Sequence, residues 1–212
     1  MRIIAGTYRG RVLATLRGPA VRPTGERLRE SLFDVLGDSI REEVFIDCYA
    51  GSGSVALEAL SRGAARVYLI EESKAAQQLI SRNLETLGLP LNAILVRASA
   101  RRGLRRLEEE GVRARYCFLD PPYPSIRAAG INQRAIRSTT RERERTLRWL
   151  ASSQLLEPHG SIIVQHDKMD APPESLGALR AWPRTRILAQ GSNALSFYSR
   201  ESSEPRPRGS GG

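Results

Sequence analysis

Lysine, cysteine, histidine and long apolar runs are all scarce in this chain of 212 residues. No stretch of about 18 uncharged apolar residues occurs, which excludes membrane-spanning helices. The two cysteines, Cys48 and Cys117, lie in apolar runs typical of buried strands, and the two histidines lack the spacing of metal ligands. We therefore expect no disulfide, no metal site and no membrane association. The N-terminus also lacks the pattern of a signal peptide, which predicts a cytoplasmic protein.

Arginine, by contrast, is abundant. The chain has 33 basic residues, of which only Lys74 and Lys168 are lysines, so 33 − 2 leaves 31 arginines, and the formal net charge is +10. Residues 1–30 and residues 124–150 each hold seven arginines against two glutamates, which gives +5 in each segment. Clustered cations favour a polyanionic partner, because binding releases counterions from its phosphates. A codon bias toward arginine is the alternative explanation.

From residue 44 onward, short apolar runs alternate with longer amphipathic segments. This alternation predicts an α/β fold, in which a mostly parallel sheet is joined by crossover helices. The expected strands are Val44–Cys48, Arg66–Ile70, Ala93–Val96, Tyr116–Leu119, Ser161–Gln165, Thr185–Leu188 and Ala194–Ser199. The expected helices occupy residues 54–62, 74–87, 101–110 and 141–153. We expect the last two strands to pair as an antiparallel hairpin.

The chain divides into three parts. Residues 1–40 are expected to form a small basic extension. It consists of a hairpin that is interrupted by glycines and of a helix whose expected N-cap is Thr24. Residues 41–200 hold the alternating pattern and form the main domain. Residues 201–212 have no periodic apolar face, and we expect them to be disordered.

A glycine-containing loop follows the first expected strand. Its sequence is Asp47-Cys48-Tyr49-Ala50-Gly51-Ser52-Gly53, at the position where open α/β sheets bind nucleotide-like ligands. The loop matches neither the G-x-G-x-x-G of hydride-transfer enzymes nor a phosphate-binding P-loop. Glu71 and Glu72 end the next strand about 20 residues later, where such folds place a carboxylate that binds the ribose hydroxyls. We predict that Glu71 is this carboxylate. Together these features predict an adenosyl ligand. An ordinary turn with a solvated strand end is the alternative.

The segment Asp120-Pro121-Pro122-Tyr123 ends the fourth expected strand, on the same sheet edge as the glycine loop. Consecutive prolines stiffen the backbone, so the Asp120 carboxylate and the Pro121 carbonyl are presented in a fixed arrangement. If each accepts one proton of an exocyclic amine, the nitrogen can pyramidalise and direct its lone pair at a methyl sulfonium. Tyr123 would stack on an extruded base. The segment therefore predicts methyl transfer to a nucleobase amine, with a merely rigid loop as the alternative.

These motifs resemble those of the RsmD-like methyltransferases, which methylate N2 of a guanine in 16S ribosomal RNA. The resemblance covers about residues 1–125. It is carried by Arg2–Gly6, Arg9–Arg11, Arg22–Thr24, Arg29–Phe33, Asp47–Gly53, Leu57–Ala64 and Asp120–Tyr123. It implies a Rossmann-like class I methyltransferase fold with a seven-stranded, mostly parallel sheet and helices on both faces. It also implies S-adenosylmethionine as the cofactor, and ribosomal RNA, the 30S subunit or its assembly intermediate as the partner of a monomer.

The resemblance assigns roles to individual residues. The implied catalytic residues are Asp120, Pro121, Pro122 and Tyr123. The implied cofactor-binding residues are Asp47, Cys48, Tyr49, Ala50, Gly51, Gly53, Glu71, Glu72, Ser99 and Asp120. The expected RNA-binding residues are Arg2, Arg9, Arg11, Arg22, Thr24 and Arg27. Ser99 departs from the family, whose members usually carry an acidic residue there to contact the adenine amine, and Gln165 stands where Glu often precedes the histidine.

Two other functions remain open at this point. An adenine-N6 methyltransferase acting on DNA or RNA would need the same pair of acceptors for its amine. A noncatalytic RNA-binding or ribosome-assembly protein on a methyltransferase fold would explain the missing acid at position 99, although it gives no reason to keep Asp47, Gly51, Gly53 and Asp120 together.

Overall fold

The computed structural model describes residues 1–15, 25–121, 133–177 and 181–200, with side chains described outside 133–138. Several predictions therefore lie outside the described residues. These are the predictions for Arg22, Thr24, Pro122, Tyr123 and the segment 201–212. Within the described ranges, no helix is both long enough and apolar enough to cross a membrane.

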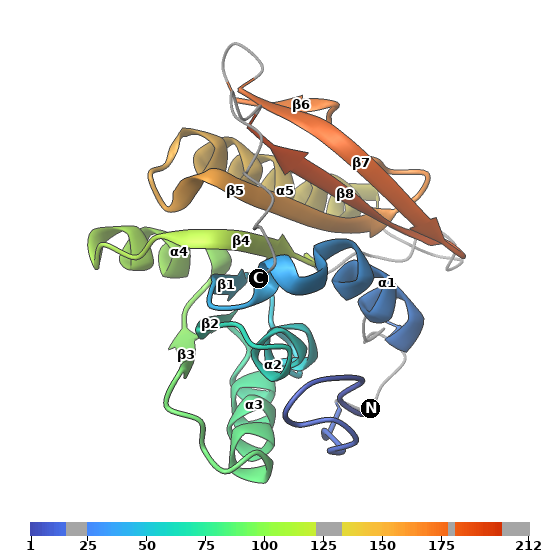
Figure 1. Ribbon diagram of the computed structural model, residues 1–212. Coiled ribbons are helices and arrows are strands. Elements are labelled where there is room, and N and C mark those ends of the chain that lie inside the picture. Colours follow the sequence, from blue (N-terminus) through green and yellow to red (C-terminus); the bar gives the residue numbers. More distant parts are fainter. Residues whose placement is uncertain (16–24, 122–132, 178–180, 201–212) are drawn as a thin grey trace, which may run out of the picture.

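A central β-sheet carries helices on both of its faces (Figure 1). The strands are β1 (Val44–Asp47), β2 (Arg66–Glu71), β3 (Ala93–Arg97), β4 (Ala114–Leu119), β5 (Leu156–Asp167), β6 (Ser175–Leu176), β7 (Trp182–Gln190) and β8 (Asn193–Ser199). The helices are α1 (Glu26–Leu36), the 3₁₀ helix η1 (Gly37–Ile40), α2 (Ser54–Ser61), α3 (Lys74–Thr86), α4 (Ala100–Glu109) and α5 (Gln133–Ser152).

The strand order is β3-β2-β1-β4-β5-β8-β7-β6. Strands β3, β2, β1, β4 and β5 pair in parallel, and the pairs that join β5 to β8, β8 to β7 and β7 to β6 are antiparallel. The predicted count of seven strands is wrong, because the described residues form an eight-stranded mixed sheet. The additional strand, β6, has only two residues, which is too short for a periodic pattern to reveal.

Two hydrophobic cores lie on opposite faces of the sheet. Neighbouring strand residues point to opposite sides, so Phe45 packs in the core beneath α1, α2 and α3, whereas Ile46 packs in the core beneath α4 and α5. Both residues are fully buried. Burial on both faces explains why the parallel strands appear in the sequence as continuous apolar runs.

Several element boundaries differ from the sequence prediction, and three of them show why. Helix α1 begins at Glu26 with Gly25 at its N-cap position. Helix α5 begins at Gln133, whereas the prediction placed its start at residue 141. The first turns of this helix are mostly polar and give no apolar periodicity, so the sequence pattern did not reveal them. Strand β5 begins at Leu156 instead of Ser161, since Leu156 pairs with Ala114 of β4 and so extends the ladder through a polar stretch.

The first 15 residues form the predicted hairpin, which we call the N-terminal hairpin. Arg2 and Val12 form an antiparallel bridge, and the Leu13 amide donates to the Met1 carbonyl at 2.7 Å. The hairpin lies beside α2 and α3 (Figure 1). Ile3 and Leu13 are buried in the core that these helices share with α1. The hairpin is therefore packed onto the main domain through its own apolar side chains.

Candidate active site

The carboxyl ends of β1, β2 and β4 meet at one edge of the sheet. Strand β1 pairs in parallel with β2 on one side and with β4 on the other. The loop after β1, Glu71 at the end of β2 and Asp120 after β4 are therefore brought together, as open α/β sheets do at their ligand-binding edge. The negative charges of Asp120 and Glu71 both act on Asp47 and raise its pKa. The three carboxylates thus lie close together at this edge of the sheet.

Two glycines shape the loop after β1. Gly51 has φ +56° and Gly53 has φ +78°, conformations that side chains disfavour. A Cβ atom at Gly53 would lie 2.8 Å from Cδ2 of Leu69, so a side chain there would have to displace Leu69 as well as adopt a disfavoured backbone conformation. The Gly53 amide donates to the Ala50 carbonyl at 2.6 Å, and α2 begins at the next residue, Ser54. The loop is a tight turn that leads into a helix N-terminus.

The loop is tied to both neighbouring strands. The Cys48 amide donates to the Phe118 carbonyl of β4 at 2.9 Å, and the Ala50 amide donates to the Ile70 carbonyl of β2 at 3.1 Å.

The two thiols, Cys48 and Cys117, are free and buried, with their Sγ atoms 3.3 Å apart. Burial, followed by the contact with Cys117, raises the pKa of Cys48 and keeps it a neutral packing group.

Glu71 is oriented by the loop itself. Its Oε2 accepts a hydrogen bond from the Gly51 amide at 2.8 Å, and its Oε1 accepts one from the Ser73 amide at 2.7 Å. Glu72 is exposed, and its carbonyl accepts a hydrogen bond from Gln77 at 3.2 Å. Of the two adjacent glutamates, Glu71 is therefore the one that faces the glycine loop.

Asp47 ends β1 and is buried. Burial is the largest cause that raises the pKa of its carboxyl, the Asp120 charge is the next, and together with smaller effects they bring it to about 8. Hydrogen bonds from the amides of Ala56 and Tyr49 act in the opposite direction. The carboxyl is thus mostly neutral at pH 7, and a cation placed beside it would favour the ionised form.

Four predicted residues border the same edge, namely Tyr49, Ser99, Asp120 and Pro121. Tyr49 is half-buried and packs in the core that includes residues of α5, and burial is the main cause that raises the pKa of this tyrosine. Ser99 occupies the N-cap position of α4, directly after β3. Asp120 is half-buried and Pro121 is buried, at the end of β4. Among the residues whose side chains are described, no group of three or more His, Cys, Asp or Glu is arranged to hold a metal ion.

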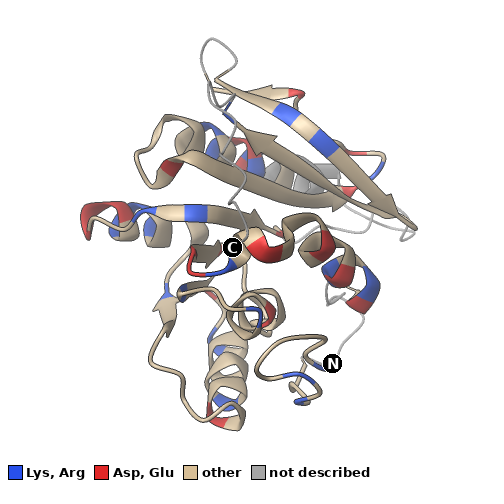
Figure 2. Ribbon diagram, viewed as in Figure 1, with Lys and Arg blue, Asp and Glu red and all other residues tan. Residues whose placement is uncertain are grey.

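The predicted RNA-binding arginines that are described are all exposed. Arg2, Arg9 and Arg11 lie on the N-terminal hairpin, and Arg27 lies on the first turns of α1. Figure 2 shows the basic residues on the hairpin. Arg2 also uses its main chain, because its amide donates to Oε1 of Glu26 at 3.1 Å.

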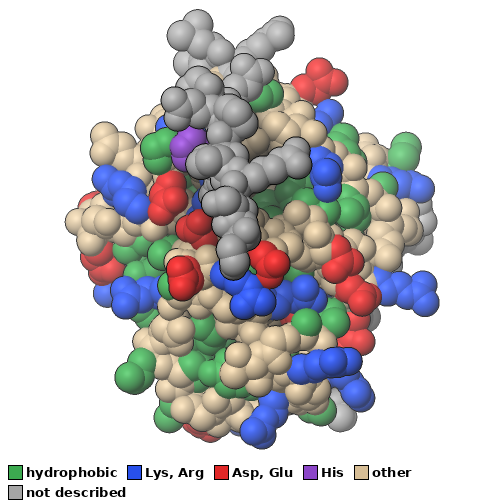
Figure 3. All heavy atoms as spheres, in the orientation of Figure 1, with side chains coloured by type: hydrophobic (Ala, Val, Ile, Leu, Met, Phe, Trp, Pro, Cys, Tyr) green, Lys and Arg blue, Asp and Glu red, His purple; other side chains and the backbone are tan. Residues whose placement is uncertain are grey.

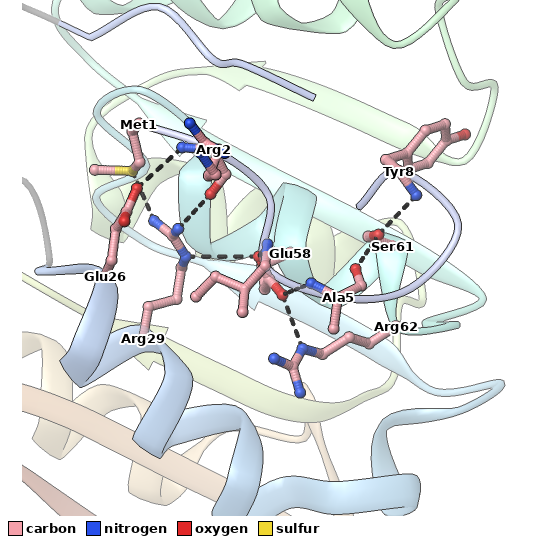
Figure 4. Close-up of polar contacts among 10 residues, drawn as sticks. Met1, Arg2, Ala5, Tyr8, Glu26, Arg29, Glu58, Ser61 and Arg62 are labelled. Carbon is pink, nitrogen blue, oxygen red and sulfur yellow. Dashed lines mark hydrogen bonds and ion pairs between the residues drawn. The ribbon is translucent and has the colours of Figure 1, made fainter. Parts of the chain in front are cut away.

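The sequence interpretation did not find the site at which the hairpin docks on α2 (Figure 4). The buried Glu58 accepts hydrogen bonds from the amides of Ile4 and Ala5 at 2.8 and 3.0 Å. It also forms ion pairs with Arg62 at 2.9 Å and with Arg29 at 3.6 Å. In the sequence, this docking site is indicated only by Glu58 being the single charged residue of the segment Ser54–Ser61, whose other residues are apolar or small.

Ser61 provides a second docking point on the same helix. Its Oγ accepts a hydrogen bond from the Tyr8 amide at 2.9 Å, and its carbonyl accepts one from the Thr7 amide at 2.8 Å. A Cβ atom at Gly6 would lie 1.7 Å from the Ser61 carbonyl oxygen. Gly6, which the sequence shows only as a turn residue, is therefore required by this close approach.

Comparisons with known proteins agree with this architecture. The family described as Conserved hypothetical protein 95 matches residues 1–199. The chain belongs to this family. It is 42% identical over 123 residues to Ribosomal RNA small subunit methyltransferase D of Escherichia coli, covering 58% of this chain and 60% of that protein. It is 32% identical over 168 residues to the protein of the same name from Haemophilus influenzae, covering 79% of each.

A solved structure gives the same result. The yhhF protein of Escherichia coli is 33% identical, covers 96% of this chain and 99% of its own, and superposes with a TM-score of 0.71. The predicted RsmD-like family and the Rossmann-like methyltransferase fold are thereby confirmed, and the chain is a methyltransferase of this family.

Proposed function

We propose that this protein transfers a methyl group from S-adenosylmethionine to the exocyclic N2 amine of a guanine in 16S ribosomal RNA. One observation carries the proposal: the glycine loop, Glu71 and Asp120 converge on one sheet edge in a chain whose relatives are named as ribosomal RNA methyltransferases. Acting on this RNA places the protein in the cytoplasm. We expect it to act as a monomer on the 30S subunit or an assembly intermediate.

The cofactor would lie over the loop Asp47–Gly53. The glycine backbone leaves room for close approach, and Glu71 holds the ribose hydroxyls with the two carboxylate oxygens that now accept the Gly51 and Ser73 amides. Ser99, at the end of β3, offers a hydroxyl to the adenine amine. When bound, S-adenosylmethionine supplies an electrophilic methyl group on a sulfonium ion.

Asp120 and Pro121 orient the guanine amine. The Asp120 carboxylate accepts one N–H and the Pro121 carbonyl accepts the other, which localises the nitrogen lone pair and aims it at the methyl group. After alkylation the nitrogen is positively charged and loses one of its two protons, so no strong base is required. Pro122 and Tyr123 complete the proposed element, with the tyrosine ring stacked on the extruded base.

The basic extension, residues 1–40, would recognise the RNA, and residues 41–200 would carry out the chemistry. Arg2, Arg9, Arg11 and Arg27 are exposed and free to approach phosphates, as electrostatic recognition of RNA requires. The proposal extends to Arg22 and Thr24, which belong to the same basic segment.

The experiment that tests the reaction is nucleoside analysis of 16S ribosomal RNA from unmethylated 30S subunits that have been treated with the protein and S-adenosylmethionine. Mass spectrometry separates N2-methylguanosine from N6-methyladenosine. We expect N2-methylguanosine only. N6-methyladenosine would show that the same acceptor geometry serves adenine, and no methylated nucleoside would contradict catalysis.

The Asp120→Ala variant tests the assigned role of the carboxylate. We expect methyl transfer to fall by about 100-fold or more, because one of two amine acceptors is lost from the transition state, whereas RNA affinity stays within twofold. Asp34→Ala, at an exposed position on α1, is the matched control. Near-normal transfer by Asp120→Ala would show that another group orients the amine.

A further inference from the structure

The N-terminal hairpin and the glycine loop are joined by one side chain, Asn83 of α3. Its Oδ1 accepts a hydrogen bond from the Ala14 amide at 2.8 Å, and its Nδ2 donates to the Ala14 carbonyl at 3.1 Å. The same Nδ2 donates to the Ser52 carbonyl at 2.8 Å. Ala14 belongs to the hairpin, and Ser52 lies between the two glycines of the loop. Asn83 thus bridges the proposed RNA-binding element and the proposed cofactor site.

This bridge leaves little freedom to either partner. Asn83 is 1% exposed, and both protons of its amide nitrogen are used. If Ala14 or Ser52 moved away, a buried polar group would lose its partner, which is costly because no water replaces it. The positions of the hairpin backbone and the loop backbone are therefore linked.

The loop is also held on its opposite side. The Gly51 amide, one residue before Ser52, donates to the Glu71 carboxylate at 2.8 Å. Asn83 and Glu71 consequently hold two peptide units of the same turn, Ser52–Gly53 and Ala50–Gly51, with one peptide unit between them. A shift of the Ser52 carbonyl therefore reaches the amide that orients Glu71, the residue proposed to hold the ribose, through a single intervening peptide unit.

A change in the position of the hairpin can affect Asn83 because the hairpin is anchored at two places, at residues 4–8 and at Ala14. Glu58 and Ser61 of α2 fix residues 4–8, whereas Ala14 lies at the far end of the hairpin, directly before residues 16–24. Segment 16–24 includes two arginines, Arg17 and Arg22, of the basic segment. A phosphate backbone bound by the hairpin arginines would hold the hairpin against α2 and α3 at both ends.

We propose that Asn83 is a positioning residue that couples RNA binding at the hairpin to cofactor binding at the glycine loop. This inference rests on the proposed function. Bound RNA restricts the hairpin, the hairpin fixes the Asn83 amide, and the amide fixes Ser52, Gly51 and Glu71 in the arrangement that receives the cofactor. Each ligand then stabilises the arrangement that the other ligand requires, which gives positive cooperativity. Because binding coupling is reciprocal, cofactor also tightens RNA binding by the same factor.

Calorimetry with S-adenosylhomocysteine, the unreactive product, measures this coupling. The dissociation constant is determined with and without saturating 30S subunits whose 16S ribosomal RNA is unmethylated. In the unaltered protein we expect the RNA to increase affinity by about fivefold or more, the usual scale of coupling between two sites. In Asn83→Ala we expect a ratio near one, because the bridge is absent. A merely structural role would weaken both measurements equally and leave the ratio unchanged.

Two further variants distinguish loss of the Asn83 hydrogen bonds from loss of packing in α3. Asn83→Asp preserves the size of the side chain and its acceptor for the Ala14 amide, but it places a second oxygen against the carbonyls of Ala14 and Ser52, so the ratio should again approach one. Leu84→Ala is the matched control, since it removes core packing from the next residue of α3 without removing a hydrogen bond to the hairpin or the loop. Its ratio should equal that of the unaltered protein.

The outcomes separate this inference from the proposed function. If the unaltered protein binds both ligands with a ratio of one, or if both Asn83 variants keep the full ratio, the coupling is overturned and the proposed function stands. If the unaltered protein binds S-adenosylhomocysteine but not the RNA, the proposed substrate is wrong and the coupling falls with it.

Discussion

Two groups of arginines in this molecule differ in their surroundings. Arg29 and Arg143 are buried, at 0% and 2% exposure, whereas Arg9, Arg11 and Arg27 are exposed. Each buried arginine faces a carboxylate. Arg29 pairs with Glu58 at 3.6 Å, and Arg143 forms hydrogen bonds to both carboxylate oxygens of its partner, Asp170, at 3.0 and 3.3 Å. The 33 basic residues therefore include cations that are buried in ion pairs and that no RNA can reach.

The two groups act on different properties of the protein. Arg29 ties α1 to the hairpin, because its guanidinium donates to the Arg2 carbonyl at 2.6 Å, and Arg143 ties α5 to the turn after β5. The exposed arginines are interspersed with acidic side chains on the face that Figure 3 shows. We therefore expect buried arginines to determine stability and exposed arginines to determine RNA affinity.

The largest effect is expected for Arg29→Ala. The change leaves the buried Glu58 with Arg62 as its remaining paired arginine and removes a donor to the hairpin, which should cost about 3 kcal/mol in the free energy of unfolding. Urea denaturation measures it. Arg27→Ala, two residues away and exposed, should change this free energy by less than about 0.5 kcal/mol. Equal effects of the two variants would remove the distinction between the groups.

Arg143→Ala should have the next largest effect on stability. Its partner, Asp170, is 29% exposed and can be rehydrated, so we expect a loss of about 1–2 kcal/mol. The exposed Arg145, on the same helix, is the control. A loss as large as that of Arg29→Ala would show that the turn after β5 depends on this ion pair more than its exposure suggests.

A buried acid extends the comparison to pH. Since the pKa of Asp47 is about 8, raising the pH through 8 ionises a carboxyl beside the proposed sulfonium position. The affinity for S-adenosylmethionine relative to S-adenosylhomocysteine should then rise by about tenfold between pH 6.5 and 9, the equivalent of one pKa unit. Only the positively charged sulfonium distinguishes the two ligands. Asp47→Asn should make the affinity ratio independent of pH, and a ratio that stays constant in the unaltered protein would contradict the assignment.

The same pKa shift has a consequence for folding. Between about pH 4 and pH 8 the folded state keeps the Asp47 proton and the unfolded state does not, so this group lowers the free energy of unfolding as pH rises. Asp47→Asn should flatten that dependence in urea denaturation at several pH values.

The smallest effect is expected for single exposed arginines. Arg9→Ala and Arg11→Ala should each weaken RNA binding by about threefold to tenfold, and each should reduce the slope of log affinity against log salt by roughly 0.7. The free energy of unfolding should stay unchanged. An unaltered salt slope would indicate that the hairpin arginines face solvent in the complex.

The sequence predicts the parallel strands of the sheet well, together with the edge at which their carboxyl ends meet. Apolar runs identify the parallel strands, and the rule that their carboxyl ends share an edge is enough to bring Glu71 and Asp120 to the loop after β1. Strand β6 could not be predicted, because two residues show no periodicity, and β5 extends through polar residues by backbone pairing alone.

The docking of the hairpin could not be predicted for a different reason. Glu58 and Asn83 bind backbone amides and carbonyls that lie 53 to 69 residues away, and main-chain groups carry no sequence signal. A polar residue on a helix looks solvated until its distant partner is known. Arg29 was likewise indistinguishable from the exposed arginines beside it, because burial is a property of the tertiary structure.

The docking of the hairpin also orders events during synthesis. Residues 4 and 5 are made long before Glu58, and Ala14 long before Asn83, so the amides of the hairpin have no native acceptors while the nascent chain is short. Domains form from their N-terminal end as translation proceeds, but this hairpin can be completed only after α2 and α3 have emerged from the ribosome. The hairpin, although it is translated before α2 and α3, can thus reach its native position only after both helices are present.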